Sequence, residues 1–186
     1  MIDYAVCILA GGQASRLDRK LERPLRGTPL IARVYGNVCG PYPIYISARA
    51  TFPAEIDAQL NCPLIIDRWN ARGPLSGLLT VFQEVVHTRM FVIAGDAPFV
   101  DRSTLEALRA AWQDGDEAVV ADPLVALYDR AAFIREALPV FHDGSASVKD
   151  VLRKLSARPL PVPKRTLTNI NTLSDLKSFE KYEVTS

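Results

Sequence analysis

The sequence predicts an α/β protein with a three-layer, Rossmann-like fold, in which helices cover both faces of a mostly parallel central sheet. In the first half of the chain, short apolar runs alternate with stretches of helical periodicity, as in parallel strands joined by crossover helices. In the second half, the apolar runs 118–121 and 124–128 are joined only by Asp122 and Pro123. Because this connection is too short for a parallel crossover, we expect an antiparallel extension of the sheet.

The composition is that of one globular domain, predicted over residues 1–186. The chain is 48% hydrophobic, which suffices for one sizeable core. Its 22 Lys and Arg balance 21 Asp and Glu, which argues against a broad electrostatic surface for nucleic acid or membrane. We find no bilayer-spanning apolar run and no signal peptide. The three scattered cysteines lack metal spacing and are expected to be reduced, which predicts a cytoplasmic protein.

The first strand is predicted over residues 4–8, where continuous apolar side chains indicate burial on both faces of a sheet. Gly11 and Gly12 follow it, and then the charged stretch 17–27, which predicts a long loop. Thr28 and Pro29 have the residue types of a helix N-cap and first turn. A helix is therefore expected from there to residue 38, followed by a strand at 43–47, a short helix at 53–60 and a strand at 64–66.

The clearest helix is predicted after the loop 68–74. Its apolar residues recur at helical spacing and are assigned to the core: Leu75, Leu78, Leu79, Phe82 and Val86. A fourth strand is expected at 90–94. Asp101 or Ser103 is expected to cap the next helix, and Thr172, with Asp175 three residues later, to cap the last one.

Three of the predicted strands end in groups that can bind a nucleotide. The first ends in Gly11 and Gly12, the third in Asp67 and the fourth in Asp96. The carboxyl ends of parallel strands meet at one edge of a sheet, so we expect these groups in one cleft. Backbone N–H groups at glycines can approach phosphate oxygens closely, and Mg²⁺ binds through one or two carboxylates plus substrate phosphates. The pattern predicts a nucleotide site with a divalent metal.

Arg16 and Lys20 lie close enough to this edge to offset charge on a transferring phosphoryl group. Two other nucleotide signatures are missing, since the chain contains neither G-x-x-x-x-G-K-[ST] nor a G-x-G-x-x-G after the first strand. These absences disfavour P-loop enzymes and dinucleotide-binding dehydrogenases. The simpler alternative is a Rossmann-like domain whose glycines only end strands and whose aspartates only cap helices.

Five segments in order along nearly the whole chain resemble the signature of the nucleotidyltransferases of the glycosyltransferase-A-like fold. Within that group the sequence is most similar to the molybdenum cofactor guanylyltransferases. The segments are LAGG at 9–12, with Arg16, Lys20 and GTPL at 27–30 downstream, GPLSG at 73–77, GDAPF at 95–99, PLVALY at 123–128 and NINT at 169–172.

The resemblance implies transfer of GMP from GTP to the terminal phosphate of molybdopterin, with release of pyrophosphate. It implies Mg²⁺ bound at Asp96, and a molybdoenzyme or cofactor-biosynthesis protein as a partner. Arg16, Lys20 and Asp96 would be catalytic. The residues implied in binding nucleotide and cofactor are Leu9, Ala10, Gly11, Gly12, Lys20, Ser47, Asp67, Gly73, Asp96 and Asn171.

Two alternatives remain open at this point. The stretch from Arg16 to Lys20 is shorter than in the family and contains no glycine, and Ser47 stands where the family often has Asn. The sequence is therefore compatible with a nucleotidyltransferase that uses CTP or another phosphate acceptor. It is also compatible with a catalytically weak relative that binds a nucleotide or hands a cofactor to a partner enzyme.

Overall fold

The fold was analysed in a computed structural model that describes residues 3–11, 19–69, 73–145, 147–172 and 174–175. Seven strands form one sheet in the order β5-β4-β1-β6-β8-β7-β9. Strand β8 runs antiparallel to its neighbours β6 and β7, while the other pairs are parallel. The strands are β1 (Tyr4–Leu9), β4 (Ile44–Ala48), β5 (Leu64–Ile66), β6 (Arg89–Ala94), β7 (Ala118–Asp122), β8 (Val125–Asp129) and β9 (Ala157–Pro159).

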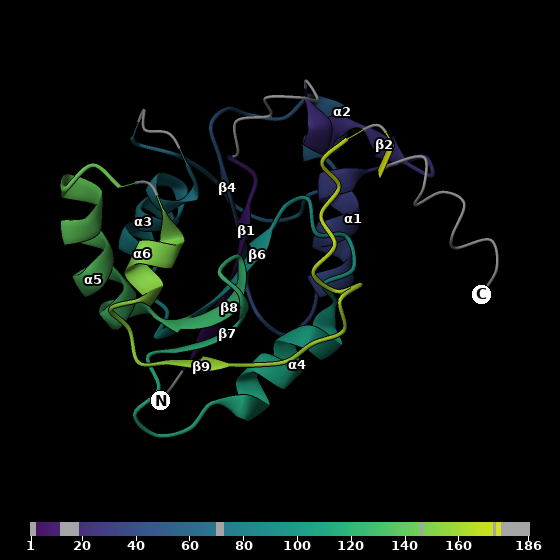
Figure 1. The fold of residues 1–186 in the computed structure, drawn as a ribbon. Helices are drawn as coiled ribbons and strands as arrows, with labels where there is room; N and C mark the ends of the chain where they lie inside the picture. The colour runs from purple at the N-terminus through teal and green to yellow at the C-terminus, as the bar shows by residue number, and fades with distance from the viewer. Residues whose placement is uncertain (1–2, 12–18, 70–72, 146, 173, 176–186) are drawn as a thin grey trace.

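Helices cover both faces of this sheet, as the sequence predicts (Figure 1). Helices α3 (Pro74–Glu84), α5 (Arg130–His142) and α6 (Val148–Leu152) pack on one face. Helices α1 (Leu30–Val38), α2 (Ala54–Asp57) and α4 (Arg102–Ala111) pack on the other. Alternate residues of β1 enter the two cores, Cys7 on one side and Ile8 on the other, and both are fully buried. The predicted α/β class with an antiparallel extension is confirmed.

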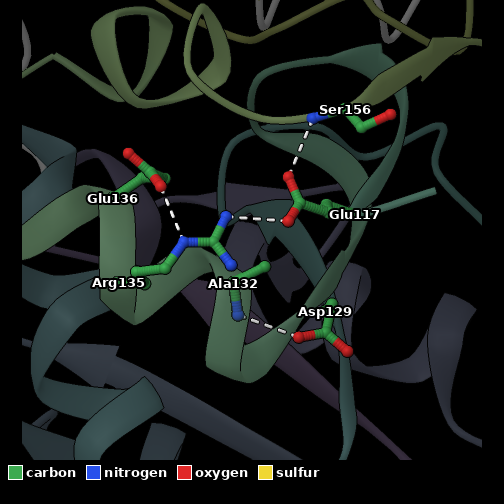
Figure 2. Close-up of polar contacts among 6 residues, drawn as sticks. All are labelled: Glu117, Asp129, Ala132, Arg135, Glu136 and Ser156. Atoms are coloured by element: carbon green, nitrogen blue, oxygen red, sulfur yellow. Dashed lines mark hydrogen bonds and ion pairs between the residues drawn. The ribbon is translucent and has the colours of Figure 1, made fainter. Parts of the chain in front are cut away.

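Charged groups tie α5 to the outer strands of the sheet. Figure 2 shows Arg135 of α5 reaching Glu117, which precedes β7, with Nη2 and Oε1 2.7 Å apart. The other oxygen of Glu117 accepts the backbone N–H of Ser156 at 2.9 Å, just before β9. Asp129 caps α5 by accepting the N–H of Ala132 at 2.9 Å. One carboxylate thus links the helix layer to the β7–β9 pair.

The structure corrects three local predictions. Thr28 and Pro29 do not open a helix but form β3 (Thr28–Pro29), which pairs with β2 (Pro24–Leu25). Between them Arg26 and Gly27 have φ values of 53° and 78°, as a tight two-residue hairpin loop requires. The predicted long loop also contains regular structure, because the 3₁₀ turn η1 (Lys20–Glu22) precedes the hairpin and β2 lies within the same stretch. Finally, α3 ends at Glu84, so Val86 is 83% exposed and lies outside the core stripe.

The rest of the α3 stripe is buried as predicted, with Leu75, Leu78, Leu79 and Phe82 all at 0% exposure. We expect Leu78→Ala and Phe82→Ala each to lower the free energy of unfolding by about 2–5 kcal/mol, because each leaves a cavity in a close-packed core. Urea denaturation measures this. Val86→Ala, at the exposed position, is the control and should change stability by less than about 0.5 kcal/mol. Equal effects at positions 82 and 86 would contradict the burial assignment.

Candidate active site

A cleft of about 520 Å³ lies where the parallel strands end, at the carboxyl edge of the sheet. Its walls come from six segments: the end of β1, the turn η1, the start of α3, the loop after β4, the loop after β6 and the turn between β7 and β8. Its lining includes Leu9, Ala10, Arg19, Lys20, Leu21, Glu22, Ala48, Arg49, Ala50, Thr51, Phe52, Gly73, Pro74, Ala94, Asp96 and Leu124. The predicted edge is therefore hollowed and lined by both polar and apolar groups.

A close approach of two strand ends places Asp96 in this cleft. The backbone N–H of Gly95, directly after β6, donates to the carbonyl of Leu9 at 2.9 Å. A Cβ atom at position 95 would lie 3.0 Å from that same carbonyl oxygen. A side chain at position 95 would therefore require this loop and β1 to move apart by a few tenths of an ångström. Glycine allows the closer approach, and the next residue, Asp96, lines the same cleft as Leu9 and Ala10.

Lys20 and Asp96 form an ion pair at the centre of the site. Lys20 Nζ lies 2.6 Å from Asp96 Oδ2, and the two side chains are only 15% and 19% exposed. The ammonium also donates to Asn171 Oδ1 at 3.2 Å. A cation is thus held between one carboxylate and one amide oxygen, and these residues come from three distant parts of the chain.

The segment after β9 returns across the site and positions Asn171. The N–H of Ile170 donates to the backbone carbonyl of Asp96 at 2.9 Å, and the Ile170 side chain, 1% exposed, packs with Leu25 and Leu30. These contacts fix one neighbour of Asn171 against the hairpin and against the loop after β6.

The other neighbour of Asn171 is fixed by a capping box. Asp175 accepts the N–H groups of Asn171 and Thr172 at 2.8 and 2.7 Å, and Thr172 Oγ1 accepts the N–H of Asp175 at 3.1 Å. The Asn171 N–H does most to lower the pKa of the Asp175 carboxyl. Thr172 and the charge of Lys20 lower this pKa further, and partial burial opposes them. The predicted cap at Thr172 is present.

Asp67 has a different environment from Asp96. Its Oδ2 accepts the hydroxyl of Ser76 at 2.7 Å, and its Oδ1 accepts the hydroxyl of Thr80 at 3.1 Å and the N–H of Trp69 at 3.0 Å. These bonds fasten the end of β5 to α3. Asp67 does not line the described cleft, and in this structure its carboxylate anchors the end of β5 and Trp69 to α3.

Ser47 also lies behind the cleft wall. It is fully buried, and its Oγ has no hydrogen-bond partner among the described residues. A Cβ at Gly77 of α3 would lie 2.6 Å from this oxygen and 2.9 Å from Leu9 Cδ1. The glycine in the middle of α3 therefore lets the helix approach the ends of β1 and β4.

The structure thus gathers some of the predicted site residues and not others. Leu9, Ala10, Lys20, Gly73 and Asp96 line the cleft, and Asn171 reaches it through Lys20. Gly11 adjoins it, since a Cβ there would lie 3.7 Å from Arg49 of the cleft wall. Ser47 and Asp67 stand behind the wall. Gly12 and Arg16 lie outside the described residues.

Sequence reasoning missed several residues of the wall, notably Glu22, Arg49 and Phe52. Arg49 and Phe52 follow the carboxyl end of β4, so the rule that found Asp67 and Asp96 could also have found them. Glu22 belongs to η1, where it pairs with Arg19 at 3.2 Å, and no periodicity signals that turn.

The two oxygens that contact Lys20, from Asp96 and Asn171, are of a type that binds a divalent cation. Among the described residues no group of three or more His, Cys, Asp or Glu could hold a metal ion. Mg²⁺ does not require such a cluster, because it commonly binds one or two protein oxygens together with substrate phosphates and water. The oxygens of Asp96 and Asn171 already face a positive charge, and such oxygens are the ligand type that Mg²⁺ takes.

A second cleft of about 460 Å³ adjoins the first. Pro74 and Leu124 line both clefts, so the two share a wall. The other lining residues come from the β7–β8 turn and the start of α6: Asp122, Pro123, Ser147, Val148 and Lys149. The two clefts are therefore adjacent at Pro74 and Leu124.

The helices in the described part of the chain include none with the length and apolar character that a membrane span requires.

Known proteins similar in sequence and in structure place the chain in a family. The model of the MobA-like NTP transferase domain family matches residues 6–159. The "Probable molybdenum cofactor guanylyltransferase" of Aquifex aeolicus is 24% identical over 178 residues, which cover 91% of this chain and 87% of that protein. The structure of molybdopterin-guanine dinucleotide biosynthesis protein A from Archaeoglobus fulgidus is 26% identical, with a TM-score of 0.82 over 98% of this chain and 100% of that one.

The fold extends beyond proteins of similar sequence. A 4-diphosphocytidyl-2C-methyl-D-erythritol synthase structure from Anaerococcus prevotii is only 10% identical, yet has a TM-score of 0.78 over 98% of this chain and 99% of that one. The match to this family, together with the fold that it shares with these structures, identifies the chain as a nucleotidyltransferase. The chain belongs to the MobA-like NTP transferase domain family.

The anchoring role of Asp67 can be tested by stability. Asp67→Ala should lower the free energy of unfolding by about 1–3 kcal/mol, because the buried hydroxyl of Ser76 loses its closer acceptor and is left with the Gly73 carbonyl at 3.4 Å. A double-mutant cycle with Ser76→Ala, followed by urea denaturation, should show that the double variant costs less than the sum of the two. Asp114→Ala, at an exposed turn, is the control. Strict additivity at Asp67 and Ser76 would argue against the anchor.

Proposed function

We propose that the protein transfers a nucleotidyl group, GMP from GTP, to the terminal phosphate of molybdopterin and releases pyrophosphate. The observation that carries the proposal is the Lys20–Asp96 pair, 2.6 Å apart in a cleft bordered by Leu9 and Ala10. The choice of GTP and molybdopterin follows the relatives from Aquifex aeolicus and Carboxydothermus hydrogenoformans, each named a probable molybdenum cofactor guanylyltransferase.

In this reaction an oxygen of the acceptor phosphate attacks the α-phosphorus of the nucleotide. The bond from that phosphorus to the oxygen bridging to the β-phosphorus breaks, and pyrophosphate leaves with the electron pair. The protein's part is to position the reactants and to stabilise charge. Lys20 neutralises phosphate oxygens, and Arg16 is proposed to assist it. Asp96 would hold Mg²⁺, which supplies further neutralisation of the phosphates.

The first cleft is the proposed nucleotide site. Its volume of about 520 Å³ lies within the range typical of small-molecule sites, roughly 300–1,000 Å³. Leu9, Ala10 and Gly11 are proposed to border the nucleotide at its edge. Gly73 has φ 94° and Pro74 opens α3 there, so the positive end of the helix dipole is directed towards the cleft. Gly12 is proposed to continue the backbone edge, and Ser47 and Asp67 to support it from behind.

The second cleft is the proposed site for the body of the acceptor. It shares Pro74 and Leu124 with the first cleft, so a phosphate near Asp96 and a ring system beyond Leu124 can be bound at once. Lys149 at its rim supplies a positive charge for an anionic acceptor. A cytoplasmic setting and transfer of the product to a molybdoenzyme or cofactor-biosynthesis partner complete the proposal.

Pyrophosphate release with Mg²⁺, molybdopterin and each of GTP, CTP and ATP tests the reaction. We expect turnover with GTP, and calorimetric titration should give GTP the lowest Kd. Asp96→Ala should abolish turnover while the protein still unfolds cooperatively. Preference for CTP would keep the enzyme class and replace the product. Nucleotide binding without turnover would favour a cofactor-binding relative, and an absence of binding would overturn the proposal.

The division into two subsites predicts separable effects. Lys20→Ala should raise the Kd for the nucleotide several-fold, because a phosphate contact is lost. Lys149→Ala should leave that Kd unchanged and raise the KM for molybdopterin. The matched control is Lys154→Ala, an exposed lysine just beyond α6 that lies outside both described clefts, and it should change neither constant. If Lys149→Ala behaves like Lys154→Ala, the acceptor lies elsewhere.

A further inference from the structure

We propose that the Lys20 ammonium occupies the cation position between Asp96 and Asn171 when no nucleotide is bound, so that Lys20 must leave before a divalent cation binds there. This inference rests on the proposed function, because it concerns the same site. It adds an order of assembly: the nucleotide phosphates attract Lys20 away from Asp96, and the vacated oxygens then accept the metal.

The geometry supports competition between the two cations. Lys20 Nζ lies 2.6 Å from Asp96 Oδ2 and 3.2 Å from Asn171 Oδ1, so one ammonium touches both oxygens. Mg²⁺ requires its oxygen ligands at about 2.0–2.1 Å in near-octahedral order. An ammonium within hydrogen-bonding distance of the same oxygens excludes that coordination by volume, and its charge repels a second cation.

The backbone that carries these two oxygens is fixed in place. Asp96 follows Gly95, whose N–H is bonded to Leu9, and its own carbonyl accepts the N–H of Ile170. Asn171 lies between Ile170, which is buried, and Thr172, whose N–H is bonded to Asp175. The negative charge of Asp175 also acts on Lys20. The backbone around both oxygens is therefore anchored, whereas the ammonium sits at the end of a flexible four-carbon chain.

Lys20 is placed to exchange one anionic partner for another. It lines the cleft proposed for the nucleotide, and its side chain is 15% exposed, so phosphate oxygens can reach it without unfolding η1. A triphosphate carries more negative charge than the single carboxylate of Asp96. Binding of the nucleotide therefore supplies the free-energy difference that moves the ammonium, as a shift between two states requires.

The test measures metal binding by the protein without nucleotide. Mn²⁺, a spectroscopic substitute for Mg²⁺, is titrated into the free protein, and electron paramagnetic resonance reports the unbound ion. We expect weak binding by the native chain and binding at least about tenfold tighter by Lys20→Met, because the competing ammonium is gone. Cooperative urea unfolding verifies that the variant is folded. Lys20→Gln, which also lacks the charge, serves as the second variant.

Two controls test whether any gain in Mn²⁺ affinity arises at Asp96. Lys154→Met removes the same unit of charge from an exposed position and should bind Mn²⁺ like the native chain. In the double variant Lys20→Met/Asp96→Asn the gain in Mn²⁺ affinity should disappear, because the site has lost the negative charge of the Asp96 carboxylate. Unchanged affinity in both Lys20 variants would overturn the proposal, as would an equal gain in Lys154→Met or a gain that persists without the Asp96 carboxylate.

These outcomes are separate from those that test the reaction. If the native protein fails to bind GTP but Lys20→Met gains Mn²⁺ affinity at Asp96, the proposed function fails and the competition at the cation position stands. If GTP is turned over but the Lys20 variants gain no affinity, the function stands and the order of assembly is wrong.

Discussion

The contact between the carbonyl of Leu9 and the backbone of Gly95 is the constraint on which the site depends. It joins the ends of two neighbouring parallel strands so tightly that a side chain at position 95 would meet a backbone oxygen at 3.0 Å. Asp96 is held beside β1 as a result, and Lys20 and Ile170 then bind to it from two distant segments. The chemistry of the cleft thus follows from a packing requirement of the sheet.

The order of the elements, the sheet class and the cleft edge could be predicted because each has a local signal. Apolar runs reveal the strands, and the residues after those runs reveal the edge, where the structure places Asp96 and Lys20 in one cleft and Asp67 behind its wall. The partners of each carboxylate carry no such signal. Asp67 and Asp96 both follow strands, but only Asp67 meets two hydroxyls from one turn of α3, and this contact depends on how the helix is placed.

The hairpin over residues 24–29 shows why other details were not predictable. Its strands contain two prolines, and its loop places Arg26 at a φ of 53°, a conformation that an arginine rarely adopts. Propensity therefore favoured a loop followed by a helix cap. Tertiary packing decides otherwise, because Leu25 and Leu30 are buried against Ile170 from the far end of the chain. A local reading cannot anticipate a partner that is more than a hundred residues away.

That long-range contact also sets the boundary of the functional unit. The family model matches residues 6–159, which include the seven-stranded sheet from Val6 onwards and most of both cores. Asn171 lies outside this range, yet its side chain contacts Lys20 and its neighbour Ile170 binds the backbone of Asp96. The family match can therefore include the whole sheet from Val6 and still leave out one of the two oxygens that contact Lys20. In this chain the segment after β9 belongs to the site as much as β1 does, because it supplies one of the two oxygens that hold Lys20.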